Sequence, residues 1–98
     1  MALFPLGKLY STHGVAALQQ QERDFADFVW RSLQRYLRGD WGDMTDGDKA
    51  RNDEAVAAGE DGGRIFGSYE HPEHPDWKVW AITESDRSCT TILFPDEY

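Results

Sequence analysis

A short acidic segment holds the densest group of side chains in this sequence that could do chemistry. From Gly39 to Glu54 the sequence is GDWGDMTDGDKARNDE, in which one tryptophan lies among the carboxylates. Carboxylates suit Ca²⁺, but an EF-hand loop needs oxygen ligands at its first, third and fifth positions and glycine at its sixth. A loop starting at Asp40 places glycine and methionine at ligand positions, and one starting at Asp46 places alanine and arginine at the fifth and sixth. Helix capping and solvation therefore explain this charge better than calcium does.

The segment Glu70–Asp76, EHPEHPD, places His71 and His74 among carboxylates. Imidazole and carboxylate groups can hold Zn²⁺ or another divalent ion, and His13 could complete such a site. The two prolines stiffen the segment, however, and no helix or strand aims the two rings at a common point. We therefore expect no metal and no cofactor.

Cys89 is the only cysteine, and together with a histidine it could act as a nucleophile. It starts an apolar stretch in which it alternates with Thr91 and Leu93, and this pattern favours a packed thiol. The glycine-rich segment Gly59–Gly63, GEDGG, lacks the lysine of a phosphate-binding loop. Paired carboxylates for glycoside chemistry would need an enclosing cleft, which so short a chain does not build easily. We therefore predict that the protein is not an enzyme.

Periodicity and turn residues predict the first elements that position these groups. Alternating side chains predict a short strand within Phe4–Ser11. Apolar residues spaced by three and four predict a long amphipathic helix over Arg23–Arg38, after a shorter helix over Val15–Gln20 capped by Ser11 or Thr12. Thr45 starts a further helix, with Asp48 completing a capping box, and this helix runs to about Ala58 and ends at Gly59.

The remaining sequence is rich in β-branched and aromatic residues and predicts strands at Arg64–Glu70, Trp77–Glu84 and Cys89–Phe94. The middle strand carries apolar residues on both faces, so we expect it to be central, with helices packed on one face. The predicted fold class is α+β in a single domain of 98 residues. It has a short N-terminal strand, two to three helices and then a three-stranded antiparallel β-meander.

The net charge of −8 is unevenly distributed. Residues 1–39 carry five basic and three acidic side chains, residues 40–61 two and eight, and residues 62–98 three and seven. Such a surface repels nucleic acid and attracts basic partners. The arginine stripe Arg31, Arg35 and Arg38 therefore favours ion pairing with the neighbouring acidic segment over nucleic-acid binding. Without a leader or a long apolar run, and with one cysteine, we expect a soluble, cytoplasmic protein that binds no membrane.

Three segments carry a resemblance to a known family. They are LGKLYSTHGVAAL at 6–18, GDWGDMTDGDKARNDEA at 39–55 and WAITESDRSCTTILFPDEY at 80–98. In this order they resemble a family of small proteins encoded on bacterial phages, plasmids and integrated elements. The family has no assigned activity, so the resemblance implies a mobile-element setting and no catalytic residues. The family differs in having a shorter hairpin in place of EHPEHPD and an apolar residue in place of Cys89.

These observations together predict a small acidic, non-enzymatic protein that binds a macromolecular partner with a basic surface, such as a host-defence or nucleic-acid-handling complex. In the sharpest form, carboxylates imitate a nucleic-acid backbone, and Trp41 either supplies an apolar contact or only fills a junction between helix and sheet. The alternatives are a structural or regulatory homodimer that pairs a sheet edge or a helix face, and a metal-dependent or Cys/His enzyme. The residues predicted to bind the partner are Asp40, Trp41, Asp43, Asp46, Asp48, Asp53 and Glu54.

Overall fold

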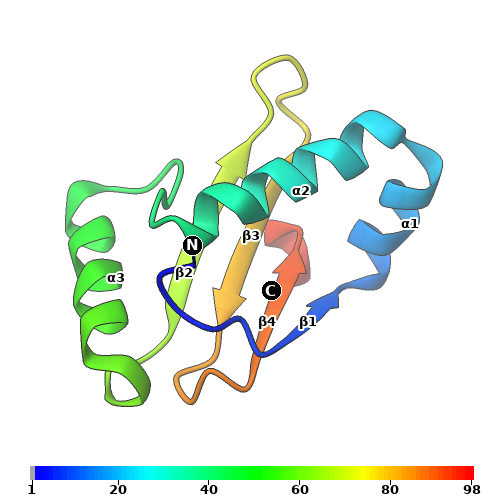
Figure 1. Cartoon of the computed structure of the whole chain (residues 1–98). Coiled ribbons are helices and arrows are strands. Elements are labelled where there is room, and N and C mark those ends of the chain that lie inside the picture. The colour runs from blue at the N-terminus through cyan, green and yellow to red at the C-terminus, as the bar shows by residue number, and fades with distance from the viewer. Residues whose placement is uncertain (1) are drawn as a thin grey trace.

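The computed structural model describes residues 2–98 and is organised around one four-stranded sheet (Figure 1). The helices and strands in chain order are β1 (Lys8–Ser11), α1 (His13–Gln21), α2 (Arg23–Leu37), α3 (Asp46–Ala58), β2 (Ile65–Glu70), β3 (Lys78–Thr83) and β4 (Cys89–Leu93). Two short 3₁₀ turns, η1 (Gly59–Asp61) and η2 (Pro95–Glu97), follow α3 and β4. No helix in residues 2–98 has the length and apolar character needed to cross a membrane.

The α+β class is confirmed, and β2, β3 and β4 pair antiparallel in sequence order as predicted. The sheet as a whole differs from the predicted three-stranded antiparallel meander, because β1 makes it a mixed sheet of four strands. The strands follow one another in space as β1-β4-β3-β2, and β1 joins the sheet parallel to β4. A parallel pair needs a long connection, which α1, α2 and α3 supply together with β2 and β3. The partners Lys8 and Cys89 lie near opposite ends of the sequence. Neither strand alone contains a signal for such a pairing.

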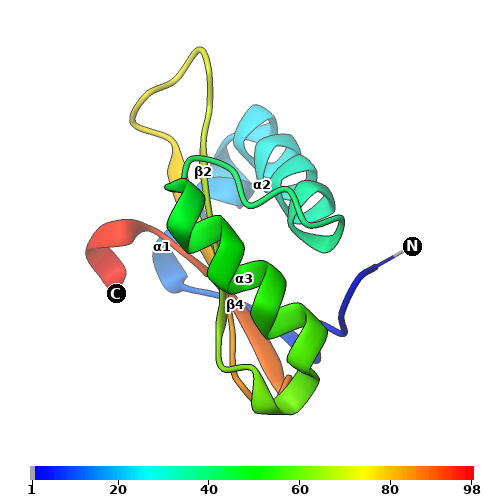
Figure 2. The same ribbon diagram turned by 90° about the vertical axis from the view of Figure 1, so that its left-hand side faces the viewer.

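The helix α2 packs across one face of the sheet, and Figure 2 shows it on the opposite side of the sheet from the C-terminus. Its buried residues recur at the helical spacing that predicted it. As expected, β3 is central, with β2 on one side and β4 on the other. Its Val79, Ala81 and Thr83 side chains are buried. The buried side chains of α2 are Phe25, Phe28, Val29, Ser32, Leu33 and Tyr36.

Helix boundaries follow the local signals. The Thr12 hydroxyl accepts a hydrogen bond from the Val15 N–H at the start of α1, and the Thr45 hydroxyl accepts one from the Asp48 N–H at the start of α3. These bonds satisfy backbone donors that have no partner inside the helix. Gly39 follows α2 with a φ of 83°, a conformation that glycine adopts without steric cost.

Candidate functional site

Trp41, predicted as an exposed contact for a partner, is buried. Only 2% of its surface is accessible, and its ring packs 5.6 Å from Tyr36 and 6.0 Å from Phe4, centroid to centroid. Its indole Nε1 donates a hydrogen bond to Asp53 Oδ1 at 3.0 Å. The prediction of an exposed Trp41 is therefore wrong, and the alternative that it fills a helix–sheet junction is confirmed.

The backbone around Trp41 explains this burial, because it runs along the free edge of β2. The Ser68 N–H donates to the Trp41 carbonyl at 3.0 Å, and the Asp43 N–H donates to the Ser68 carbonyl at 2.7 Å. A Cβ at Gly42 would lie 1.9 Å from the Ser68 carbonyl oxygen, so only glycine allows this approach. The segment thus acts as an additional short pairing partner for the sheet.

Asp40 is held in an ion pair with Arg35, which confirms ion pairing of the arginine stripe at one position. Arg35 Nε lies 2.7 Å from Asp40 Oδ2, and its Nη2 lies 3.1 Å from Oδ1. The hydrogen bond from Arg35 lowers the pKa of Asp40 below its usual value. The Arg35 guanidinium also lies 5.0 Å from the centre of the Tyr69 ring. The Asp40 carboxylate therefore already has an ion-pair partner within the protein.

The remaining predicted carboxylates divide into two groups. Asp48 contacts Arg51 at 3.4 Å, and this ion pair takes the place of the capping-box contact expected for its side chain. Asp53 accepts the Trp41 hydrogen bond described above. Asp43, Asp46 and Glu54 are exposed. A role for these exposed side chains in binding a partner stays a prediction.

The histidines and the cysteine lie at opposite ends of the sheet (Figure 1), because β3 separates the loop after β2 from the turn before β4. The Cys–His pair of the predicted enzyme alternative is therefore not formed. His74 stacks on Trp77 at 4.1 Å, and His71 packs edge-on against Phe28 at 5.3 Å. In residues 2–98 no group of three or more His, Cys, Asp or Glu side chains could hold a metal ion.

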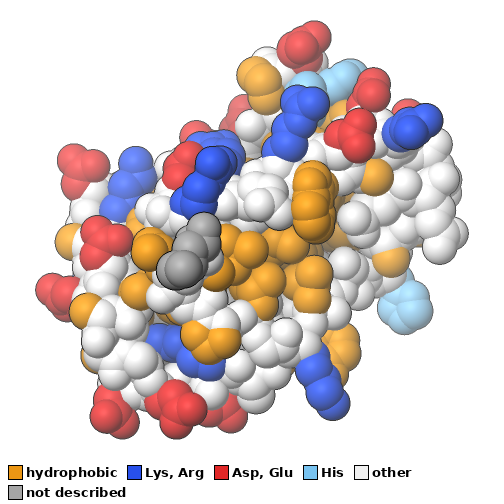
Figure 3. Space-filling view, viewed as in Figure 1, with side chains coloured by type: hydrophobic (Ala, Val, Ile, Leu, Met, Phe, Trp, Pro, Cys, Tyr) orange, Lys and Arg blue, Asp and Glu red, His pale blue; other side chains and the backbone are white. Residues whose placement is uncertain are grey.

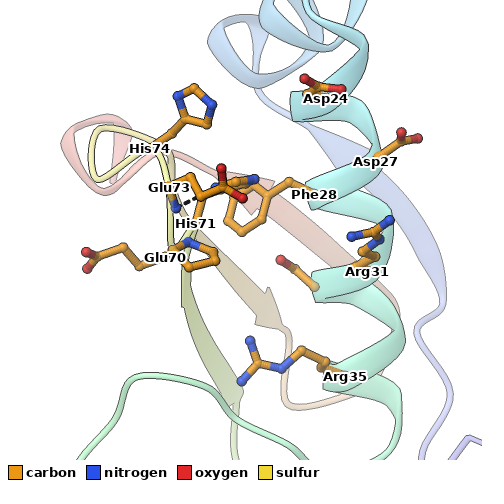
Figure 4. A pocket seen from close by; sticks show the side chains of 11 residues that line it. Asp24, Asp27, Phe28, Arg31, Arg35, Glu70, His71, Glu73 and His74 are labelled. Atoms are coloured by element: carbon orange, nitrogen blue, oxygen red, sulfur yellow. Dashed lines mark hydrogen bonds between the residues drawn. The ribbon is translucent and has the colours of Figure 1, made fainter.

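A cavity of about 400 Å³ lies between α2 and the loop that joins β2 to β3 (Figure 4). The helix contributes a stripe of charged residues spaced by three, four and four, namely Asp24, Asp27, Arg31 and Arg35. The loop contributes His71, Glu73 and His74. The spacing of these charges along α2 is visible in the sequence, but their convergence on the loop depends on the tertiary structure.

Trp30 is an exposed aromatic residue that sequence reasoning missed. Its side chain is 62% accessible, although it lies on the same helix as the buried Phe25, Phe28 and Tyr36. The signal was its position outside the apolar period of α2. Hydrophobic side chains gather below α2 on this face of the molecule (Figure 3).

Two exposed leucines, Leu3 and Leu9, lie on the same side of the sheet as Trp30. The Leu3 N–H donates to the Leu37 carbonyl at 2.9 Å, which places the N-terminal segment beside the end of α2. Leu9 pairs with Thr90 and so points to the face that α2 covers. We call the exposed side chains Leu3, Leu9 and Trp30 the Trp30 surface.

Comparison of the chain with protein-family models, with curated proteins and with solved structures finds no match. The resemblance to a mobile-element family therefore stays a prediction.

Proposed function

We propose that this chain is a non-enzymatic binding protein, that its partner is a protein with a basic surface, and that the partner packs on the Trp30 surface. The exposure of Trp30 carries the proposal. Exposed apolar patches mark interaction sites, and tryptophan is enriched among the residues that dominate binding energy.

The net charge supports the choice of a basic partner. At −8, the field of the molecule attracts cationic proteins over several ångströms and accelerates their encounter. Asp43, Asp46 and Glu54 contribute to this field as exposed carboxylates. The proposal does not extend to imitation of nucleic acid, because Trp41 is buried and Asp40 and Asp53 already have partners within the protein. A mobile-element origin and a host-defence target are supported only by the sequence resemblance.

The test compares Trp30→Ala with Tyr10→Ala, a matched loss of a half-exposed aromatic side chain that points to the opposite face of the sheet. Immobilised wild-type and variant proteins capture partners from a lysate of the source cells, and quantitative mass spectrometry identifies basic proteins that depend on Trp30. The dissociation constant of the purified candidate is then measured. We expect Trp30→Ala to weaken binding about 30-fold or more, as at an interface hot spot.

The two variants separate binding from folding. Both should unfold within about 0.5 kcal/mol of the wild type, because substitutions at the surface seldom change stability by more. Equal affinity of the wild type and Trp30→Ala for every captured protein would show that the Trp30 surface is not the binding site.

One observation favours self-association as a second function. All residues of β1 are exposed, and β1 is an edge strand with a neighbour on one side only. The N–H groups of Lys8 and Thr12 donate to β4 and its preceding turn, so that the N–H of Ser11 points outward by the alternation of a strand. Sedimentation equilibrium should then show a dimer that Ser11→Pro converts to a folded monomer. A wild-type monomer at about 100 μM, far above the Kd of a stable dimer, would contradict this function.

A further inference from the structure

The imidazole of His71, the first residue of the loop that joins β2 to β3, is half-buried among aromatic rings. It lies 5.3 Å from both the Phe28 ring on α2 and the Trp77 ring, centroid to centroid. The His74 ring lies 4.9 Å away on the loop itself. Trp77 in turn packs edge-on against Phe25 of α2 at 5.4 Å. The position of the His71 ring is therefore coupled to the packing of the loop on α2.

The same imidazole is a hydrogen-bond acceptor for the backbone of the loop. The Glu73 N–H donates to His71 Nδ1 at 3.0 Å (dashed line in Figure 4). An imidazole nitrogen accepts a hydrogen bond only while it carries no proton, because in the imidazolium both nitrogens are donors. The loop conformation therefore requires an unprotonated Nδ1 at His71. Histidine is the side chain whose charge ordinarily changes between about pH 5 and 8.

An imidazolium at this position would have carboxylates nearby as new hydrogen-bond acceptors. Of the two arginines that line the cavity beside the loop, Arg35 is already paired with Asp40. The protonated ring thus has alternatives to its contact with the Glu73 N–H, and the loop has a second arrangement available to it. The titratable and charged groups around His71 are Asp24, Asp27, Arg31 and Arg35 on α2, Glu70, Glu73, His74 and Asp76 around the loop, and Lys78 at the start of β3.

We infer that His71 makes the β2–β3 loop a pH-sensitive switch. When Nδ1 takes up a proton from the solvent, two donors face each other, the Glu73 N–H loses its acceptor, and the imidazolium turns toward a carboxylate. Because the ring packs against Phe28 and Trp77, this rotation displaces the loop from α2. At higher pH the neutral imidazole restores both the hydrogen bond and the contact with Phe28.

The test is a pH titration of the whole ¹⁵N,¹³C-labelled chain between about pH 8 and 5, followed by NMR. We expect the Glu73 amide and the Phe28 ring to change their chemical shifts with the same midpoint as the His71 ring. The protection of the Glu73 amide from hydrogen exchange, relative to an unstructured peptide at the same pH, should fall about tenfold on protonation, because its hydrogen bond is lost. Titration of His71 with constant Glu73 and Phe28 signals would overturn the inference.

Two matched variants assign the switch to one ring. His71→Asn cannot titrate, but an asparagine oxygen accepts from the backbone N–H two residues on, as in an Asx turn. This variant should keep the Glu73 hydrogen bond and lose the pH dependence of the Glu73 and Phe28 signals. His74→Asn removes the neighbouring imidazole, which stacks on Trp77 at 4.1 Å, and should leave the transition in place. A transition that persists in His71→Asn, or that His74→Asn abolishes, would show that another group controls the loop.

Discussion

At the scale of single residues, Arg87 holds the end of α3 against the sheet. It is 7% accessible and has a φ of 61°, a conformation that glycine or asparagine usually takes. Its side chain accounts for its presence there, since the guanidinium donates only to backbone carbonyls. A cation at this position also complements the negative C-terminal end of the helix dipole. The acceptors are Ala55, Gly59, Gly63, Glu84 and Ser85, at distances from 2.6 to 3.2 Å.

We expect Arg87→Met to lower the free energy of unfolding by about 2–4 kcal/mol, because it leaves one buried and several partly buried carbonyls without a donor. Urea denaturation followed by tryptophan fluorescence measures this loss. Arg51→Met is the control, since the exposed ion pair of Arg51 with Asp48 should contribute less than about 1 kcal/mol. Equal losses in the two variants would show that the buried hydrogen bonds of Arg87 contribute little.

At the scale of elements, the edge of β2 that does not pair with β3 is covered by the Asn52 side chain and by the loop around Gly42. Asn52 on α3 acts as a peptide group would in a neighbouring strand: its Nδ2 donates to the Phe66 carbonyl at 2.6 Å, and its Oδ1 accepts from the Phe66 N–H at 3.1 Å. Gly42 pairs with Ser68 two residues further along. This edge is therefore not available to another chain, in contrast to β1.

Asn52→Ala should destabilise the protein by about 2 kcal/mol, because both backbone groups of Phe66 lose their partner. Hydrogen exchange gives a more specific measurement, since the Phe66 amide should exchange faster than the other amides of β2. Glu54→Ala, an exposed substitution on the same helix, should change neither quantity. Unchanged protection of Phe66 in Asn52→Ala would mean that water replaces the side chain without cost.

The elements also show how far the sequence determines the fold. The end of α2 and the start of α3 were predictable, because Gly39 and Thr45 contact only residues within one helical turn of them. The place of β1 in the sheet was not, since it depends on β4. The burial of Trp41 was not predictable for the same reason. The backbone of the linker around Trp41 is hydrogen-bonded to Ser68, which lies far along the chain. At the candidate site, the charged stripe of α2 was visible in part, whereas Trp30 was overlooked.

At the scale of the whole molecule, Glu97 joins the C-terminal segment to the start of α1. The Thr12 hydroxyl donates to Glu97 Oε1 at 2.6 Å, and the N–H groups of Phe94 and Gly14 donate to its carboxylate at 2.9 and 3.3 Å. Burial acts to raise the pKa of Glu97, but these hydrogen bonds outweigh it and hold the pKa below its usual value. The folded state therefore favours the ionised carboxylate.

The sign of the pH dependence follows from this lowered pKa. The stabilisation is fully present above the unfolded pKa of glutamate, about 4.3, and is lost as the pH falls through the lower folded value. Glu97→Gln should thus be less stable than the wild type near neutral pH, and the difference should shrink on acidification. Urea denaturation at a series of pH values measures this. Asp96→Asn, at a neighbouring exposed carboxylate, is the control, and a constant difference between Glu97→Gln and the wild type would contradict the assignment.

The parallel pairing of β1 with β4 constrains the order in which the protein can fold during synthesis. Both strands of this pair are needed before β1 can enter the sheet, and β4 leaves the ribosome after the other three strands of this sheet. Until then α2 has only part of the surface that covers Phe25 and Tyr36, since Ile92 of β4 belongs to the same core. Contacts between such distant segments slow folding and leave apolar surface open to chaperones. A translational pause before β4 would prolong the time for which this apolar surface stays uncovered.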